Sequence, residues 1–312
     1  SSNSRSSDAS SNTVTLALLV GVVVAGAVVA PLVMVRATWA DSAPRTVIAW
    51  WYAQGVLLLI SVLSLAVAVT VVPLHGNLVN RVIDFFGALM SPHPLRGLGL
   101  SEAVGLTLLT DLLILVLGGV VVGSVNSWGR RLRHHDLVDL VARRDETRNV
   151  YVIEHDRPAA YFVPGRGGRV VVSEGLFNGF EGDEVDAIVA HEHGHRVGHH
   201  GLWLAPLHSI RPFFSFVPFA RFAPIAVKAA IEMIADDFAV AKVGLVPLTR
   251  ALREAHRFDV APPGAVPWQG NVIQRRTRRL ESPPISRRGA LVAWLYLAVS
   301  GATIAVAWLS NG

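Results

Sequence analysis

Four stretches of this chain are long and apolar enough to cross a bilayer, and they constrain its fold more than any other feature. A helix needs about 20 apolar residues to cross the hydrocarbon core. The stretches cover residues 13–35, 47–74, 103–125 and 289–309. Composition agrees, because only 16% of the residues are charged, whereas an ordinary soluble domain carries about 25%. The sequence therefore predicts an α-helical integral membrane protein with four transmembrane helices, preceded over residues 1–12 by a disordered tail.

The arginines beside these stretches predict the orientation of the chain. They cluster after the third stretch and before the fourth. The clusters are Arg130, Arg131, Arg133, Arg143 and Arg144, then Arg275, Arg276, Arg278, Arg279, Arg287 and Arg288. Because loops rich in arginine stay in the cytoplasm, residues 126–288 are predicted to form a cytoplasmic domain, with both termini on the other side. Residues 13–125 would carry three helices, and residues 289–312 the fourth helix and a short tail.

Charge and cysteine content exclude several kinds of site. The formal net charge is +5, but arginines that flank apolar stretches are expected to meet anionic lipid headgroups rather than nucleic acid. The chain has no cysteine, which excludes disulfides, thiolate metal ligands and a cysteine nucleophile. The lipid bilayer is thus a predicted partner, and no direct contact with nucleic acid is expected.

One ionisable residue, Asp111, falls near the middle of the third apolar stretch. A carboxylate there costs about 2.5–3.5 kcal/mol on insertion scales. One interpretation is a relay or signalling contact. The favoured interpretation is a carboxyl buried against other helices and either paired or protonated.

The strongest motif in the predicted domain is the pentapeptide from His191 to His195, which reads H-E-x-x-H. On a helix His191 and His195 share one face, one turn apart, so both imidazoles can reach a single metal ion. Glu192 is rotated by roughly 100° from His191 and can contact a metal-bound water without being a ligand. Two imidazoles, an open coordination position and a carboxylate that takes a proton are typical of a hydrolytic zinc site.

A tetrahedral zinc site needs a third protein ligand, and the sequence offers two sources. His199 shares a face with the two motif histidines, but a straight helix should not wrap three successive turns around one ion. The favoured source is the pair Glu232 and Asp236, one turn apart on a helix predicted over residues 226–243. One carboxylate can bind the metal while the other orients a ligating imidazole. Asp237 is expected to point elsewhere.

This residue set predicts metal-assisted hydrolysis of a peptide bond. Zn²⁺ held by the two histidines and Glu232 would lower the pKa of a bound water toward about 7. Glu192 would accept the proton as the water attacks the peptide carbonyl, and would then pass it to the leaving amine. Weak candidates for stabilising the oxyanion are His199, His200 and Arg211.

The motif is surrounded by predicted strands and helices. A charged helix-like stretch covers residues 132–144, and β-like runs cover residues 150–154, 159–163 and 169–173. The glycine-rich join at residues 165–168 predicts a hairpin between the last two runs. The motif helix is expected to start near Asp183 and to weaken or end at Gly198 and Gly201.

Residues 202–223 form an apolar segment that is interrupted by three prolines and two arginines. One interpretation places the segment on or in the membrane interface, anchored by phenylalanines. These are Phe213, Phe214, Phe216, Phe219 and Phe222. The other interpretation is a buried core segment, and the sequence leaves both open.

Two runs of residues carry a resemblance to a known family. They are PAAYFVPGRGGRVVVSEGLFNGFEGDEVDAIVAHEHGH and EMIAD. The first resembles the edge strand, glycine turn, strand ending in S-E-G-L and H-E-x-x-H helix of the gluzincin membrane peptidases, and the second resembles their E-x-x-A-D element. The resemblance implies that Glu232 is the third zinc ligand and that Asp236 supports a ligand from the second shell. It also implies that an edge strand binds an extended substrate by β-addition. Here that strand comprises Ala159, Ala160, Tyr161, Phe162 and Val163.

Two branches of this family share the core. One contains HtpX-type quality-control proteases and CAAX prenyl proteases, and the other contains BlaR/MecR-type sensor-transducers, which cleave a cytoplasmic winged-helix repressor. The order of the apolar stretches, and RATWADSAPRTVIAWWYAQG between the first two, are more similar to the BlaR/MecR type. Two features depart from that type. Only three residues follow residue 309, so the penicillin-binding sensor domain is expected to be absent, and His200 stands where the family often has Asp.

Three hypotheses about function follow. The favoured one is a membrane zinc endopeptidase that cleaves a cytoplasmic protein, namely a winged-helix repressor in a signalling pathway. The second is an HtpX-like quality-control protease for membrane proteins. The third is a non-catalytic receptor or metal-binding scaffold, against which Glu192 argues, because binding alone does not need that residue. The expected cofactor is Zn²⁺, the expected partners are a protein substrate and the bilayer, and a homo-oligomer stays open.

Overall fold

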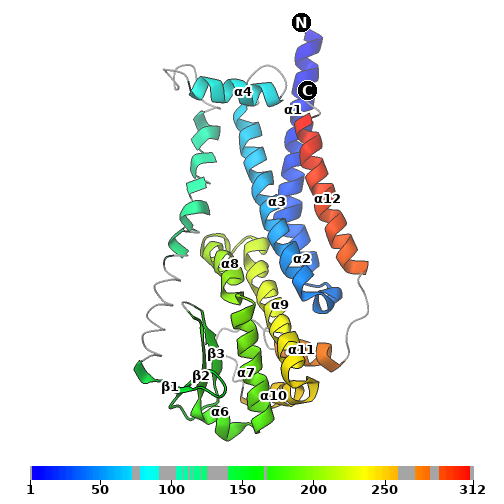
Figure 1. The fold of residues 1–312 in the computed structure, drawn as a ribbon. Helices are drawn as coiled ribbons and strands as arrows, with labels where there is room; N and C mark the ends of the chain where they lie inside the picture. Colours follow the sequence, from blue (N-terminus) through cyan, green and yellow to red (C-terminus); the bar gives the residue numbers. More distant parts are fainter. Residues whose placement is uncertain are drawn as a thin grey trace.

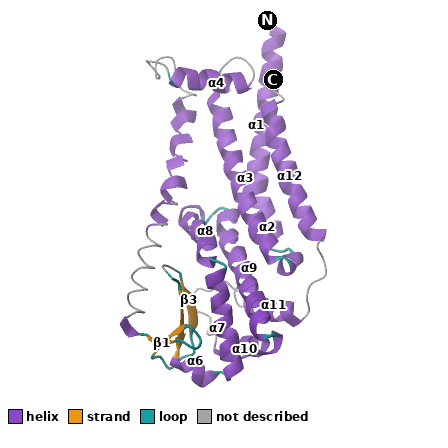
Figure 2. Ribbon diagram, in the orientation of Figure 1, coloured by secondary structure: helices purple, strands orange, loops and turns teal. Residues whose placement is uncertain are grey.

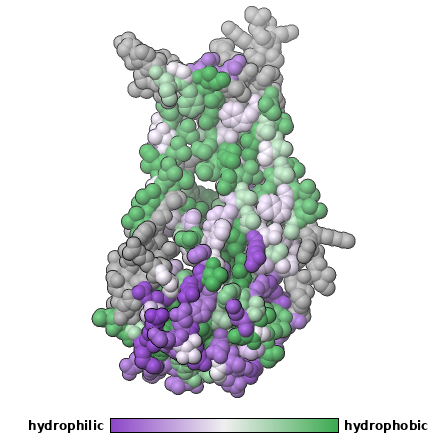
Figure 3. Space-filling view, in the orientation of Figure 1, coloured by the Kyte–Doolittle hydropathy of each residue, from purple (hydrophilic) through white to green (hydrophobic). Residues whose placement is uncertain are grey.

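Long helices occupy one end of the molecule and a smaller domain of helices and strands occupies the other (Figures 1 and 2). The computed structural model describes residues 2–71, 78–90, 103–125 except 108, 112, 115, 120 and 124, 140–164, 167–258, 271–281 and 288–309. Figure 3 shows hydrophobic residues over the long helices and hydrophilic residues over much of the domain. This separation agrees with the prediction of a membrane protein that carries a polar domain.

Among the described residues, four helices are long and apolar enough to cross a membrane. They are Asn12–Met34, Pro44–Val71, Ala103–Gly123 and Gly289–Leu309. The first comprises the end of α1 (Ser2–Val24), a π-helical turn (Ala25–Val29) and α2 (Ala30–Met34), the second is α3 (Pro44–Val71), and the fourth lies in α12 (Arg288–Leu309). These bounds lie within a few residues of the predicted stretches, so length and composition confirm the four candidate spans.

Helix α1 departs from the predicted disordered tail. It begins at Ser2 and continues without a break into the first span. Extending a helix that already exists adds one backbone hydrogen bond per residue without a new nucleation step. The structure thus continues α1 over residues 2–12, where the sequence predicts a disordered tail.

The spans pack into a bundle that extends away from the domain (Figure 1). Helices α1, α3 and α12 share one apolar core, formed by Leu19, Val22, Ala68, Val71, Ile304 and Ala307. Trp50 Nε1 donates to the carbonyl of Ala293 at 3.0 Å, which ties α3 to α12. Both termini lie far from the domain, and α4 (Leu78–Leu89) lies across that same end (Figure 1). Which side faces the cytoplasm stays a prediction.

Asp111 is not placed as expected. Its side chain is exposed, so the favoured prediction of a carboxyl buried against other helices is wrong. The third span contacts its neighbours through another face, where a Cβ added to Gly105 would overlap Thr70 and one added to Gly123 would overlap Ser209. Asp111 lies about 120° around the helix from Gly105.

The domain contains a sheet with the strand order β1-β2-β4-β3. Its strands are β1 (Arg143–Asp145), β2 (Val150–Ile153), β3 (Ala160–Val163) and β4 (Arg169–Ser173). Strands β3 and β4 form the predicted antiparallel hairpin, and β4 pairs with β2 in parallel. Strand β3 is therefore an edge strand, as expected. The strand β1 occupies the end of the stretch predicted to be helix-like, and residues 132–139 of that stretch lie outside the described residues.

Helix α7 (Gly182–Val197), which carries the motif, packs between the sheet and α9. Its start is fixed by a capping box, in which Glu181 and Glu184 each bond the other's backbone N–H, and Gly198 caps its end. Val185 and Val189 pack against the sheet and α6 (Glu174–Gly179). The opposite face packs against α9 and α10 (Leu245–Phe258). Helix α7 is thus buried on two sides, which holds the motif in place.

The apolar segment at residues 202–223, for which the sequence left two interpretations open, is mostly helical. Residues 202–223 lie in α8 (His200–Phe214) and in the first turns of α9 (Pro218–Val243), which together form a hairpin. Helix α9 therefore begins eight residues before the predicted position 226. Pro218 lies in its first turn, where its lack of an N–H costs nothing.

The hairpin buries one face against α3 and exposes its tip. Phe219 is only 6% exposed, and its ring lies 5.8 Å from that of Trp51. A Cβ added to Gly55 would lie 3.0 Å from the Phe219 ring, so α3 and α9 approach closely there. Phe216, at the tip, is 80% exposed. The interpretation as a buried core segment thus holds for the face that packs on α3. The interpretation as an interfacial segment remains for the exposed tip.

We expect the tip to contact lipid. Phe213, on the same hairpin, is also exposed at 45%, and exposed aromatic side chains are typical anchors at a membrane interface. Since the chain has no cysteine, a single nitroxide can be attached to Phe216→Cys in nanodiscs. Its accessibility to oxygen should exceed that to a water-soluble nickel complex, whereas a label on Lys242→Cys should show the reverse. Equal nickel access at both positions would rule out contact with lipid.

Candidate active site

The site forms where α7 crosses α9, and Gly194 permits the close approach. A Cβ added to Gly194 would lie 3.1 Å from Ala235 Cα and 3.2 Å from Phe238 Cβ. A contact this tight would force the two helices apart. The glycine inside the H-E-x-x-H motif therefore lets the motif histidines reach Glu232 on α9.

His191, His195 and Glu232 converge as predicted. One ligand atom from each lies within 4.8 Å of the others. The two Nε2 atoms are 3.1 Å apart, and the Glu232 carboxylate lies 3.3 Å from His191 Nε2 and 3.7 Å from His195 Nε2. Two imidazole nitrogens and one carboxylate form the ligand set of many catalytic zinc sites. The donor chemistry and spacing therefore fit Zn²⁺.

Each motif histidine has a partner for its other ring nitrogen. His191 Nδ1 donates to Asp236 Oδ1 at 2.9 Å, and Asp236 is fully buried. The Nδ1 atoms of His195 and His200 lie 2.8 Å apart, and His200 is 4% exposed. A ligating Nε2 must be unprotonated, so His195 donates through Nδ1 and His200 accepts. His200 thus lies beside His195, on the ring nitrogen that faces away from the ligand cluster.

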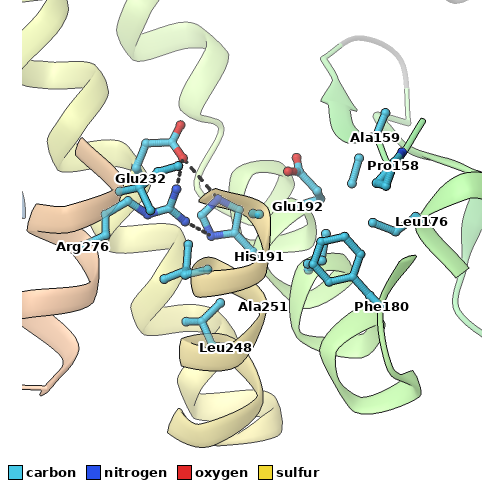
Figure 4. Close-up of a pocket in the computed structure, with 15 residues that line it drawn as sticks. Pro158, Ala159, Leu176, Phe180, His191, Glu192, Glu232, Leu248, Ala251 and Arg276 are labelled. Carbon is cyan, nitrogen blue, oxygen red and sulfur yellow. Dashed lines mark hydrogen bonds and ion pairs between the residues drawn. The ribbon is translucent and has the colours of Figure 1, made fainter. Parts of the chain in front are cut away.

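Arg276 is a site residue that the sequence reasoning missed. It belongs to α11 (Asn271–Glu281), and its guanidinium donates twice to Asp236, through Nε at 2.8 Å and Nη2 at 2.6 Å. Its Nη1 lies 3.3 Å from Glu232 Oε2. Figure 4 shows Arg276, Glu232 and His191 meeting at one side of the cavity. A guanidinium that holds both carboxylates fixes their positions relative to His191.

The charges at this cluster shift the pKa values of its members. Burial alone lowers the pKa of His191, but its hydrogen bonds to Asp236 and Glu232 outweigh burial and raise it to about 9. Burial raises the pKa of Glu232, but the bond to His191 and the charge of Arg276 hold it well below the usual range. Glu232 is therefore ionised, as a metal ligand must be. Since zinc binds the neutral imidazole, metal binding displaces a proton from His191.

Glu192 faces the cavity and is not part of the ligand cluster (Figure 4). Burial raises the pKa of its carboxyl to about 7, and the charge on His191 opposes that shift. A hydrogen bond from the backbone N–H of Phe162 also favours the carboxylate. A base with a pKa near neutrality can both accept and return a proton.

The cavity has a volume of about 350 Å³ and joins the ligand cluster to the sheet edge. Of the predicted substrate-binding residues, Ala159 and Ala160 line it. The side chain of Val163 is buried instead among apolar residues. Apolar residues from the helices complete the wall, and they are Leu176, Phe180, Ile188, Leu248, Ala251, Leu252, Ala255 and Ile273. An extended peptide would pair with the backbone of β3, so these side chains need not all face it.

Two other candidates from the sequence lie outside the cluster. His199 is exposed and has a left-handed backbone (φ 48°), and it is not among the grouped metal-binding residues. Arg211 is exposed near the far end of α8. Neither supports the predicted role of third ligand or oxyanion contact. Asp237 does point away from the cluster, where Arg279 holds it with two hydrogen bonds.

Comparison with known proteins finds one similarity, to a peptidase family. Residues 129–255 match the model of peptidase family M48, whereas no curated protein and no solved structure matches the chain. The matched residues include the H-E-x-x-H motif, Glu232 and Asp236, and they end before Arg276. Over residues 129–255 the chain is therefore similar to peptidase family M48, a family of zinc metallopeptidases.

Proposed function

We propose that this chain is a membrane-embedded zinc endopeptidase whose site faces the cytoplasm. The observation that carries the proposal is the position of Glu192. Its carboxyl faces a cavity that has the ligand set His191, His195 and Glu232 on one side and the edge strand β3 on the other. A base between a metal site and a peptide-binding edge is the arrangement that peptide hydrolysis requires.

The residues divide the chemistry between them. Zn²⁺, when bound by His191, His195 and Glu232, supplies Lewis acidity toward a water and a peptide carbonyl. Glu192 accepts the proton of the attacking water and returns it to the leaving nitrogen. Glu192 lines the cavity together with Ala159 and Ala160, so its carboxylate lies beside the substrate edge. Asp236 keeps His191 oriented through its Nδ1.

Strand β3 would bind the substrate as an added strand. Its one ladder partner in the described sheet is β4, so its other edge can accept an extended peptide. Ala159 and Ala160 line the cavity with small side chains that leave room for the peptide beside Glu192. This geometry favours an endopeptidase that recognises its substrate mainly through backbone hydrogen bonds and to a lesser extent through side chains.

We propose a cytoplasmic winged-helix repressor as the substrate, on the resemblance of the span order and of residues 36–55 to the BlaR/MecR type. A second candidate, quality control of membrane proteins, is favoured by the place of the site. Glu232 lies 13 residues along α9 from Phe219, or about 20 Å, and Phe219 packs on α3. The metal cluster therefore lies close to the spans, within reach of a membrane-bound segment.

Proteomics can separate these candidates. Cells that express the wild type should be compared with cells that express Glu192→Gln, and new protein termini should be assigned in soluble and membrane fractions. One cleaved soluble DNA-binding protein supports the repressor. Many cleaved membrane proteins support quality control. Identical termini in both cell lines, together with bound zinc, would favour the non-catalytic metal-binding scaffold.

A further inference from the structure

Three arginines of α11 each bind a carboxylate on another element. Arg275 binds Asp41, Arg276 binds Asp236, and Arg279 binds Asp237. Asp236 and Asp237 lie on α9, whereas Asp41 belongs to the turn Thr38–Ser42 that joins the first two spans. Helix α11 therefore lies between the membrane turn and the metal site.

The membrane turn holds α11 through Asp41 at two points. The Asp41 carboxylate accepts from Arg275 Nε at 3.2 Å and also from its Nη2, and the Asp41 carbonyl accepts from Arg279 Nε at 2.7 Å. The Asp41 side chain is only 23% exposed and that of Arg279 only 13%. Trp39, in the same turn, packs on Gly289 at the start of the fourth span. The turn thus packs on the bundle and also binds α11.

On its other side α11 reaches the metal ligands through Arg276. That side chain is 11% exposed, and its partner Asp236 is fully buried. Asp236 in turn bonds His191, and Arg276 also lies against Glu232. Charge-assisted, bidentate bonds between buried groups fix geometry more firmly than exposed pairs do. A displacement of α11 would therefore move Arg276 and, with it, the carboxylates of Asp236 and Glu232.

Helix α11 depends on such contacts for its position. It has 11 residues, and an isolated helix of that length is marginal in water. Besides the arginine pairs, α11 packs on α10 and α9. Leu280 joins the α7–α10 core, Ile273 lines the cavity, and Glu281 pairs with Arg253. The Arg253 side chain is 66% exposed, so that pair contributes little. Asp41, which accepts hydrogen bonds from two arginines of α11, is therefore the anchor that ties this helix to the turn between the spans.

We propose that Asp41 is a positioning residue of the metal site: the turn between the first two spans holds α11, and α11 holds Arg276 on Asp236 and Glu232. The inference rests on the proposed peptidase function and adds a physical link between the membrane bundle and the reacting groups. A change in the packing of α2 and α3 reaches the ligands through Asp41 without passing through the substrate cavity.

The test compares Asp41→Asn with Asp186→Asn in nanodiscs. Asp186 also pairs with one arginine, Arg148 at 2.8 Å, but on the exposed face of α7. Zinc affinity, measured against a competing chelator, and kcat should each fall about 3- to 10-fold in Asp41→Asn, with KM nearly unchanged. Asp186→Asn should match the wild type. The charge swap Asp41→Arg with Arg275→Asp should restore most of both losses.

A distance measurement covers the case in which Asp41→Asn folds poorly. Nitroxides on Gln274→Cys in α11 and Lys242→Cys in α9 report the separation of the two helices, because the chain has no other cysteine. In Asp41→Asn the distance distribution should shift or broaden, and the charge swap should restore it. Unchanged distances together with unchanged zinc affinity would overturn the proposal. A wild type that binds zinc but cleaves nothing would instead overturn the proposed peptidase function. The zinc affinity and the distances would still show whether Asp41 positions the metal site.

Discussion

Replacing Glu192 with Gln is expected to lower peptide cleavage by a factor on the order of 10³ while zinc content stays at the wild-type level. The amide is nearly the same size as the carboxyl and can still accept the N–H of Phe162, but it cannot take a proton from water. The motif histidines and Glu232 keep their positions, because Glu192 lies outside their hydrogen-bonded cluster. Single-turnover cleavage and metal analysis of the same purified sample measure the two effects.

The matched control for this prediction is Asp186→Asn, six residues earlier on α7. It also turns a carboxylate into an amide, but its side chain is 49% exposed and pairs only with Arg148 among the described residues. Cleavage by this variant should equal that of the wild type. A Glu192→Gln protein that retains full activity would show that another group takes the proton, and the assignment of Glu192 as the base would fail.

The metal cluster could be predicted because its spacing is local. His191 and His195 are one turn apart, and so are Glu232 and Asp236, so a helix alone fixes which side chains share a face. What the sequence left open was the meeting of the two helices. That meeting depends on Gly194, whose missing side chain admits Ala235.

Arg276 could not be recognised from spacing, because it lies 40 residues beyond its partner Asp236. Arg276 also lies in a run of arginines next to an apolar stretch. The positive-inside rule accounts for such a run by membrane orientation alone, so the sequence gives no reason to look for a carboxylate partner. A signal was present. Asp236 is an acid on a mostly apolar helix, and a buried carboxylate requires a cation. Arg276 on α11 supplies this cation.

The segment at residues 202–223 was ambiguous because its prolines argue against the helices that it forms. Pro206 and Pro212 both lie inside α8. An interior proline removes a backbone hydrogen bond, so local propensity predicts a break. Tertiary packing reverses that preference, since the hairpin buries Leu207 and Phe219 in the core that it shares with α3. Such packing cannot be read from a single segment.

Replacing Glu232 with Ala is expected to weaken zinc binding by more than about 100-fold and to abolish cleavage with it. Loss of a ligand should exceed the roughly 10- to 100-fold effect of losing a group that only supports one. The fold should survive, because Arg276 keeps both bonds to Asp236 when Glu232 is gone. Zinc competition with a chelator and thermal unfolding of the metal-free protein measure the two expectations separately.

Asp236→Ala provides the contrast that makes the Glu232 result specific. It removes both carboxylate oxygens that accept from Arg276 and leaves this guanidinium, 11% exposed, without its main counter-charge. Breaking one side of a buried pair costs about 3–5 kcal/mol, so this variant should lose stability as well as zinc. If Glu232→Ala instead binds zinc like the wild type, the third ligand lies elsewhere. Zinc loss without loss of stability in Glu232→Ala, and loss of both in Asp236→Ala, would assign one carboxylate to the metal and the other to the guanidinium that holds the site together.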